Sequence, residues 1–376
     1  MDAVLLESLL GDDARTREES WRYSKIALRA LTQQMFVAAT AGATLSPQML
    51  ERIDLAFTRG RRIVFVNGRY SERHSDLGKA GSDIVIRRQS EQRVTITIAA
   101  GSGEPLHLAY VSVAGDSPSL WQASIGIEVQ GGHAELIEQH IGENGAEVFG
   151  ALNSQITLAP QSELHATCWS ELADSVSLLL KTNCSVGRAA MYAVTHAHCG
   201  GRLQRIESRI DLAGAHAGCR SRGVFALRGR QHTDIHLDVR HKARDTQSNV
   251  FWRGVADQRA RGVFHGAITV AAGADGADAQ LSNKNLLLSP QAEIDTRPVL
   301  EIYADEVKAS HGATVGQLDE TALFYLRSRG VPAAVARALL ISGFCREALE
   351  SIPSAALREY LDAMLQARLP QHGGEA

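Results

Sequence analysis

Hydrophobic residues alternate with polar residues along most of the middle of this chain, which is the pattern of half-buried β-strands. The alternation begins near Arg61, with Ile63 and Phe65, and continues as far as Leu300 and Ile302. It recurs at Val94/Ile96/Ile98, Ile125/Ile127/Val129, Val176/Leu178, Ile206/Ser208/Ile210 and Ile235/Leu237/Val239. We therefore expect short strands throughout residues 61–317, with only Glu135–Ile141 ambiguous.

Apolar residues take helical spacing at both ends of the chain. Near the start, Ser46-Pro47 predicts a helix, because serine caps a first turn that proline fits. Before this pair of residues, Val4, Leu5, Leu9, Trp21, Ile26, Leu28 and Leu31 follow an amphipathic pattern, and the helix after it is expected to bury Leu50, Ile53 and Phe57. Near the end, Leu323, Phe324 and Leu326 start a helix, Val335, Leu339 and Leu340 belong to a second one, and after a Ser354 cap Leu357, Leu361, Met364 and Leu365 form one stripe. The expected organisation is a helical domain over 1–60, a β core over 61–317 and a helical domain over 318–376.

Two architectures accommodate so many short strands: a sandwich or barrel, and a β-solenoid. Hairpin signals are few, with Asn67-Gly68 the clearest and Asn144-Gly145 a second candidate. Small polar corners such as AAGADGADAQ suit a solenoid, yet no strict repeat is visible, so the periodicity leaves the choice open. A solenoid would end in an unpaired strand edge that must be capped or paired with another chain.

Composition narrows the range of partners. The 376 residues include 39 basic and 42 acidic side chains, a net charge of −3, which gives no general attraction for nucleic acid or an anionic membrane. No segment has the roughly 20 apolar residues that span a bilayer. The first residues lack the basic-then-apolar order of a secretory signal, so we expect a cytoplasmic protein.

Conventional catalytic motifs are missing from the sequence. There is no phosphate-binding G-x-x-x-x-G-K-[ST] loop, no G-x-S-x-G elbow and no H-E-x-x-H helix. Five cysteines, Cys168, Cys184, Cys199, Cys219 and Cys345, contain no C-x-x-C pair. This spacing argues against a disulfide framework, a cysteine-rich zinc site and a cluster held by four cysteines of this chain.

Three groups of histidines can be interpreted either as metal ligands or as ordinary surface or structural residues. His232, Asp234, His236 and Asp238 share one strand face, opposite Ile235, Leu237 and Val239. His196 and His198 share another face, from which the adjacent Cys199 points away. Both faces are interpreted as exposed outer surfaces. His311, in a Ser-His-Gly-Ala-Thr-Val-Gly-Gln turn, is on chemical grounds alone a turn histidine with a structural hydrogen bond.

Five segments of the chain resemble the SufB/SufD family of iron–sulfur cluster assembly scaffolds. They are EESWRYSKIALRAL at 18–31, IVFVNGRYS at 63–71, NVFWRGVADQRARGVFHGAITVAAGADGADAQLSNKNLLLS at 249–289, HGATVGQLDE at 311–320 and FYLRSRGVP at 324–332. The last two resemble the SufD branch specifically, because the SufB branch differs there.

The resemblance implies a right-handed parallel β-helix flanked by N-terminal and C-terminal helical domains. It also implies a non-catalytic scaffold subunit whose β-helix edge pairs with a SufB-type paralogue. In isolation we expect a homodimer, since identical open edges can pair through a two-fold axis. The C-terminal helices, from about Leu318 to Leu369, would dock a SufC-type ABC ATPase. The expected interface residues are Ser310, His311, Gly312, Thr314, Phe324, Tyr325, Arg327 and Arg329.

In the family, the histidine that corresponds to His311 lies where a nascent cluster forms between the two paralogues. The resemblance therefore implies no cofactor held tightly by this chain alone, and iron or an iron–sulfur cluster passing transiently through the interface. One departure matters: Ala309 stands where the family commonly has cysteine. The partner would then supply most ligands.

Two other functional classes remain open at this stage. A carbohydrate-acting β-solenoid enzyme would need paired carboxylates on one outer face, for which Asp234 and Asp238 are the candidates. A self-assembling structural β-helix would need only its open edges.

Overall fold

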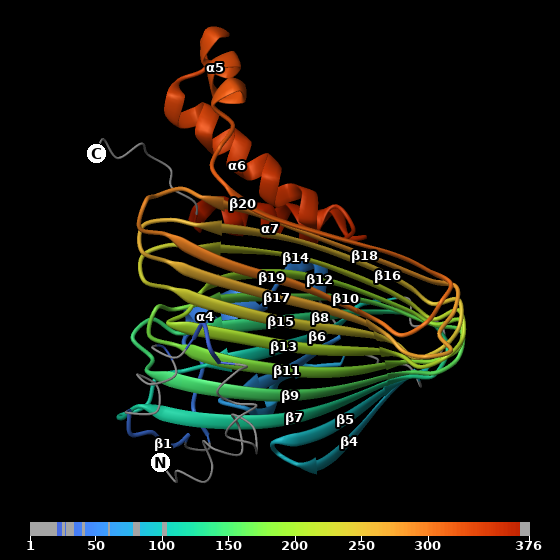
Figure 1. Ribbon diagram of the computed structural model, residues 1–376. Helices are drawn as coiled ribbons and strands as arrows, with labels where there is room; N and C mark the ends of the chain where they lie inside the picture. Colours follow the sequence, from blue (N-terminus) through green and yellow to red (C-terminus); the bar gives the residue numbers. More distant parts are fainter. Residues whose placement is uncertain are drawn as a thin grey trace.

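Two ten-stranded sheets stack side by side as a β-solenoid in the computed structural model (Figure 1), which describes residues 21–24, 27, 34–39, 42–58, 61–77, 83–99 and 104–368. In one sheet the order is β19 (Glu293–Ile302), β17 (Arg261–Val270), β15 (His232–His241), β13 (Leu203–Leu212), β11 (Ser177–Val186), β9 (Val148–Leu158), β7 (Ser119–Val129), β5 (Arg93–Ile98) and β4 (Ile84–Ser90), with β1 (Val37–Ala38) beside β7. In the other it is β20 (Val307–Gly316), β18 (Ala277–Leu287), β16 (Gln247–Ala256), β14 (Gly218–Leu227), β12 (Met191–Gly200), β10 (Ser162–Leu172), β8 (Gly132–Gly142), β6 (Leu106–Ser112), β2 (Arg62–Val66) and β3 (Arg69–Asp76).

From β6 onward, successive strands alternate between the two sheets and pair in parallel with the strand two places along. This pairing decides the architecture that periodicity left open, in favour of the solenoid. The predicted hairpin at Asn67-Gly68 is confirmed, since it joins antiparallel β2 and β3 through two residues with positive φ. Asn144-Gly145 is a solenoid corner rather than a hairpin, because β8 and β9 lie in different sheets. The ambiguous stretch Glu135–Ile141 is strand, within β8.

Backbone hydrogen bonds between corners tie one rung to the next. Gln161, Ala189, His216 and Asp245 occupy successive corners with φ between 53° and 62°. Each N–H donates to a carbonyl in the following corner, as Ala189 does to Ala215 at 2.9 Å. A side chain in this left-handed region costs about 1–2 kcal/mol, so the stacked hydrogen bonds hold a conformation that the sequence does not favour locally. Because the corner residues vary in type, no repeat is visible in the sequence.

Inward-facing side chains form the main core between the two sheets. The alternating positions predicted as buried in β5, β7 and β15, such as Ile96, Ile127 and Leu237, are confirmed there. Ile302 departs from the pattern and is exposed, since β19 is the last strand of its sheet. No later rung covers its apolar row.

Near the start of the described chain, α4 (Pro47–Ile53) and the 3-10 turn η1 (Ala56–Thr58) pack against the second sheet. The predicted start is confirmed: the Ser46 hydroxyl accepts from the N–H of Met49, and Pro47 opens the helix. The predicted buried face is partly wrong, because Met49 and Ile53 are buried whereas Leu50 is exposed. The N-terminal helical domain expected over 1–60 stays a prediction, since Val4, Leu5, Leu9, Ile26, Leu28 and Leu31 lie outside the described residues.

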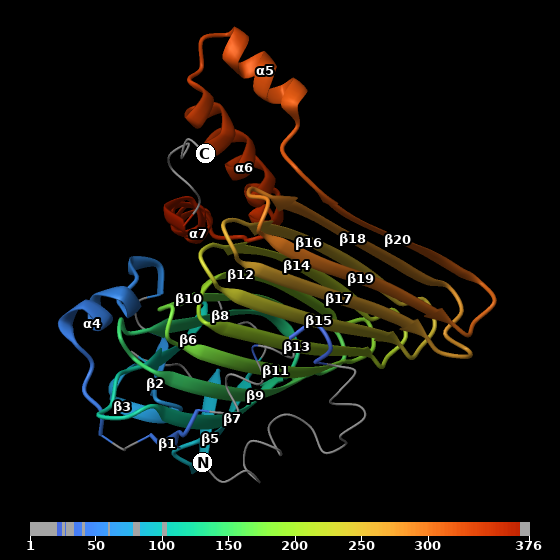
Figure 2. The same ribbon diagram turned by 60° about the vertical axis from the view of Figure 1, so that its left-hand side comes forward.

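Three helices follow β20: α5 (Glu320–Ser328), α6 (Ala333–Leu349) and α7 (Ala355–Arg368). α6 and α7 cover the outer face of β12, β14 and β16, burying Cys199, Val224 and Val255, while α5 extends beyond the solenoid (Figure 2). The Ser354 cap and the α7 stripe Leu357, Leu361, Met364 and Leu365 are confirmed.

The predicted second helix, with Val335, Leu339 and Leu340, is confirmed as α6, and the structure shows which of its positions are buried. Val335 and Leu339 are exposed, and the buried positions are Ala336, Ile341, Cys345, Ala348 and Leu349. α6 turns its smaller side chains toward the sheet, which leaves two large apolar side chains on its outer face.

Trp252 fills the solenoid interior at one rung and determines what its neighbour can be. Its partner on β14 is Gly223, and a Cβ built on that glycine would lie 2.6 Å from carbons of the indole ring. The indole Nε1 donates to Ser221 Oγ at 3.3 Å, which fixes the ring in place.

We predict that Gly223→Ala lowers stability by about 1–3 kcal/mol, because the added methyl group overpacks a buried ring that cannot move aside. Gly312→Ala is the matched control, since a Cβ at this strand glycine meets nothing within 4 Å. Urea unfolding midpoints of the two variants test this; equal midpoints would contradict the packing account.

Candidate interface and metal-ligand residues

The solenoid has an open end at β19 and β20. Each of these strands has a single neighbour, β17 and β18 respectively, so its other edge carries backbone N–H and C=O groups without a strand partner among the described residues. Nearly all of β20 is exposed. An unpaired edge of this kind is a template for pairing with another strand.

His311 lies near the middle of this last strand. Its Cα pairs with that of Leu281, whose side chain belongs to the interior core, so strand alternation puts the imidazole on the inward row at the mouth of the solenoid. Ala309 lies on the same row, whereas Ser310, Gly312 and Thr314 belong to the outward row. His311 is exposed because no further rung covers it.

The other predicted interface residues are also exposed. Phe324 and Tyr325, on α5, keep 71% and 57% of their surface accessible. Arg329 lies over the Tyr325 ring at 5.2 Å from its centroid, and Arg327 is exposed nearby on the same helix. Together with Val335 and Leu339 these side chains give α5 and α6 an outer surface that is apolar and basic without a covering element among the described residues.

The face carrying His232, Asp234, His236 and Asp238 is an outer face, as predicted, but it is not uniformly exposed. Asp234 and His232 are buried beneath the segment around Trp21 and Ser24. The Ser24 hydroxyl donates to Asp234 Oδ2 at 2.5 Å and lies 2.8 Å from His232 Nε2. The exposed interpretation is therefore wrong for these two residues, because a distant part of the chain covers them.

Arg205 completes this buried network. Its Nη1 is 2.6 Å from Asp234 Oδ2, and its guanidinium lies 4.1 Å from the centroid of the Trp21 ring. Burial opposes ionisation of Asp234, but Arg205 and the hydrogen bonds from His236 and Ser24 hold its pKa below the usual value. We call this network, which holds residues 21–24 against the sheet, the latch. The Asp234 carboxylate is occupied by its contacts with Ser24 and Arg205.

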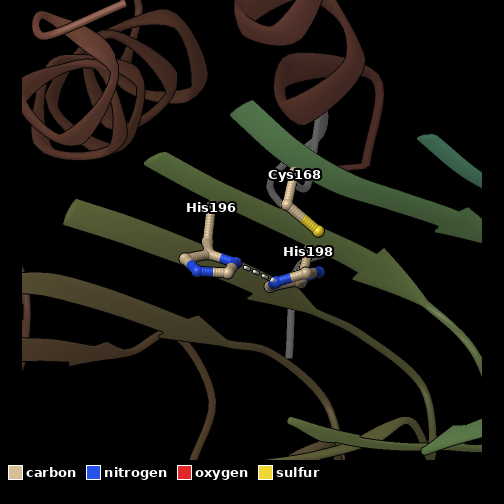
Figure 3. A group of neighbouring side chains, drawn as sticks. All are labelled: Cys168, His196 and His198. Atoms are coloured by element: carbon tan, nitrogen blue, oxygen red, sulfur yellow. Dashed lines mark hydrogen bonds between the residues drawn. The ribbon is translucent and has the colours of Figure 1, made fainter. Parts of the chain in front are cut away.

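His196 and His198 point into the solenoid rather than onto its surface, so their predicted exposure is wrong (Figure 3). Their cysteine neighbour is Cys168 on β10, whose Cα pairs with that of His196, and not the outward-facing Cys199. The sulfur of Cys168 and one nitrogen of each imidazole lie within 4.8 Å of one another. His196 Nδ1 and His198 Nε2 are 3.2 Å apart.

Further polar side chains extend this interior cluster. Glu138 Oε1 lies 3.8 Å from Cys168 Sγ and accepts from His140 Nε2 at 2.6 Å. Burial lowers the pKa of His196 to about 4, lowers that of His198 well below its usual value, and raises the pKa of the Cys168 thiol. Both imidazoles are therefore neutral at pH 7 and keep a lone pair each.

A second group with metal-ligand spacing lies on the outer face of β8 and β10. It consists of His133, Glu163 and His165, whose ligand atoms are also within 4.8 Å of one another. His165 Nε2 is 2.8 Å from Glu163 Oε1, and His133 is largely exposed. Our sequence reasoning missed this group and the Cys168 cluster, because in each the ligands come from two neighbouring strands.

An open groove of about 410 Å³ on the first sheet is the obvious place to look for hydrolytic chemistry. Its lining includes Arg93, Lys181 and Asn153, and none of the described lining residues is a carboxylate. Asp234 is buried in the latch, while Asp238 pairs with Arg240 Nη2 at 2.7 Å. The two carboxylates considered from the sequence for glycosidic chemistry are therefore each engaged by an arginine.

The family model and the relatives that match this chain all belong to the SufBD family. The family model for the SUF system FeS cluster assembly, SufBD core domain, matches residues 111–344. The chain is 28% identical to the iron–sulfur cluster assembly protein SufD of Escherichia coli, over 97% of this chain and 92% of that one. It is 27% identical to a SufBD family protein of Synechocystis, over 94% of this chain and 86% of that one, and 26% identical to one of Mycobacterium tuberculosis, over 94% of this chain and 88% of that one.

In the part of the chain that the structure describes, no helix is long and apolar enough to cross a membrane.

Buried histidines away from the Cys168 cluster make stability depend on pH. Burial lowers the pKa of His107 to about 3 and the pKa values of His232 and His241 to about 4. Between an unfolded value near 6.5 and these folded values, the unfolded chain binds protons that the folded chain does not. Stability must therefore fall as pH drops from about 6.5 to about 4.

We predict that the urea unfolding midpoint decreases over that window, with each such histidine adding at most about 1.4 kcal/mol per pH unit. His241→Gln should make the decrease less steep, whereas His216→Asn, at an exposed corner, should leave the slope unchanged. A midpoint that is flat between pH 7 and pH 4.5 would contradict the assignment.

Proposed function

This chain belongs to the SufBD core family of the SUF system for iron–sulfur cluster assembly, and we propose that it acts there as a SufD-type, non-catalytic scaffold subunit of a SufB–SufC–SufD complex. The observation that carries the proposal is the open end of the solenoid, with an exposed histidine on its inward row. We propose that the protein acts in the cytoplasm, as expected from its sequence.

A SufB-type paralogue is the proposed partner at β19 and β20. A partner solenoid ending in similar strands would pair with the free backbone groups and cover the exposed Ile302, Tyr303 and Val315. Without that partner, two copies of this chain can pair the same edges about a two-fold axis, which gives a homodimer. Ser310, His311, Gly312 and Thr314 would lie within this interface.

Iron or a nascent iron–sulfur cluster is the proposed cargo of the interface. Imidazole is a suitable iron ligand, and His311 is the one residue of β20 with a metal-ligating side chain. Ala309, its neighbour on the inward row, cannot contribute a ligand. The paralogue must therefore supply the thiolates, and the chain alone would hold the cargo only transiently.

The C-terminal helices are the proposed docking surface for a SufC-type ABC ATPase. Phe324 and Tyr325 are exposed on α5, flanked by the basic Arg327 and Arg329. Exposed aromatic and arginine side chains together are the composition of binding hot spots. The sequence has no phosphate-binding loop of its own, which supports an arrangement in which ATP is handled by another subunit.

The finer features of the fold are part of the same proposal. We take the solenoid to be right-handed, because parallel strand–crossover–strand connections almost always have that hand. We also keep a helical domain over 1–60, a β-helix over 61–317 and a helical domain over 318–376.

A carbohydrate-acting enzyme is disfavoured, since Asp234 and Asp238 are occupied by Arg205 and Arg240.

We predict that His311→Ala leaves the fold and partner binding intact but lowers cluster formation on the complex at least about ten-fold, the size of effect seen when a metal site loses a supporting group. The measurement is cluster absorbance after reconstitution of the complex with iron and sulfide. His216→Asn, another exposed histidine, should form clusters at the parental level. Normal cluster formation by the His311 variant would remove the residue from the proposal.

We predict that Phe324→Ala/Tyr325→Ala weakens binding of the ATPase by at least about thirty-fold, or about 2 kcal/mol, because both rings are exposed and available as anchors. Val85→Ala is the matched control, since Val85 is equally an exposed apolar residue but lies on β4, in the hairpin at the other end of the sheet. Titration calorimetry with the purified ATPase measures both, and unchanged affinity for the double variant would move the contact elsewhere.

A further inference from the structure

The interior of the solenoid contains a set of side chains that hydrophobic packing does not explain. Cys168, His196 and His198 are buried between the sheets, and their ligand atoms converge within 4.8 Å (Figure 3). Other rungs fill the corresponding positions with Leu108 and Trp252. A thiol and two imidazoles in place of apolar groups require compensation for lost hydration.

A chain of hydrogen bonds fixes which nitrogen of His198 carries its proton. The Gln204 amide donates to the carbonyls of Cys199 and Gly200, at 3.1 and 2.7 Å, so its Oε1 must face Ser170 as an acceptor. The Ser170 hydroxyl donates to that oxygen at 2.5 Å and lies 2.9 Å from His198 Nδ1. The Ser170 oxygen therefore accepts from His198 Nδ1–H, and the bare lone pair is on Nε2.

In this structure that lone pair accepts from His196 Nδ1–H, at an N–N distance of 3.2 Å. An ion between the two nitrogens would replace this proton, which moves to His196 Nε2, and the separation is close to the roughly 3.3–3.6 Å between ligand atoms in a tetrahedral zinc site. A histidine whose second nitrogen is held by an outer hydrogen bond is the usual arrangement of a metal ligand. Ser170 and Gln204 supply that outer support here.

We propose that Cys168 Sγ, His196 Nδ1 and His198 Nε2 form an internal site for one divalent transition-metal ion of the zinc class. The Glu138 carboxylate lies 3.8 Å from the sulfur but converges with Cys168 and His140 rather than with the two imidazoles, so its side chain would have to shift toward the ion to become the fourth ligand. One thiolate and one carboxylate balance the two positive charges of the ion, which suits an interior position. Sulfur, imidazole and carboxylate donors in this number are the combination that zinc prefers.

One contact of the cluster is weak without an ion. Cys168 Sγ and Glu138 Oε1 are 3.8 Å apart, which is long for a hydrogen bond. His140 Nε2 meanwhile holds Glu138 at 2.6 Å. An ion would convert His140 into the outer partner of a ligating carboxylate, again the common pattern.

The internal site and the proposed cargo site at His311 differ in burial and in their location along the solenoid. His311 is exposed at the open end, whereas all three donors of the internal site are buried several rungs away. The internal ion would be resident and loaded as the chain folds. The inference stands whether or not the scaffold function proposed above is correct.

The test is metal analysis of the full chain, purified from cells grown with zinc and, separately, with cobalt as a spectroscopic probe. After dialysis against EDTA, we expect one zinc ion per chain. The cobalt form should show a thiolate-to-cobalt charge-transfer band in the near ultraviolet. Cys168→Ser should abolish that band, and His198→Gln should lower metal content at least ten-fold.

Matched variants separate this site from the alternatives. Cys219→Ser removes another buried thiol of the same core, His133→Ala disrupts the surface group, and His311→Ala removes the cargo ligand; each should retain full metal content. Metal below stoichiometry in the parental chain, or loss through His133→Ala instead, would overturn the proposal. If Cys168→Ser does not fold, a cobalt form of the parental chain without a thiolate band would overturn it equally.

Discussion

The structure depends on each rung of the solenoid being covered by the next in strict register. A strand here has no core of its own: its inward row is buried only because side chains of adjacent rungs stack on it. The consequence is visible along one ladder, in which Cys168, His196, Gly223, Trp252 and Asn283 follow each other as Cα partners. Choice of residue at one rung therefore constrains the neighbouring rungs, as Trp252 does for Gly223.

The same constraint makes the last rung different from all others. β19 and β20 present an inward row and a hydrogen-bonding edge that no further rung covers. Helices of the same chain can cover such strands. α6 and α7 do cover the outer face of β12, β14 and β16, but they do not cover the end strands β19 and β20. Here α5 instead extends past the end and leaves it open (Figure 2). The exposed end is therefore the surface on which the proposed partner subunit would pack.

Local periodicity was enough to predict the strands, the Ser46 cap and the C-terminal helices, because alternation, a cap and helical spacing can each be recognised within a few residues of sequence. The interior position of His196 and His198 was also readable, since they share strand parity with the apolar Tyr192 and Val194. Burial of Asp234 beneath Ser24 was not, because it depends on chain segments 210 residues apart. The choice of solenoid over sandwich likewise depended on pairing between strands, which alternation does not specify.

Aromatic packing separates the interior cluster from the open end. The Trp252 ring stacks on His196 at 5.3 Å and contacts the Phe264 ring at 5.7 Å, so the rung beyond the cluster is filled. Past this layer, near the mouth, Asn283 accepts from Thr296 at 2.7 Å. A path for ions along the interior would have to cross this aromatic layer. The two polar regions are thus better suited to separate tasks: stabilisation by a resident ion inside, and exchange of cargo with a partner at the end.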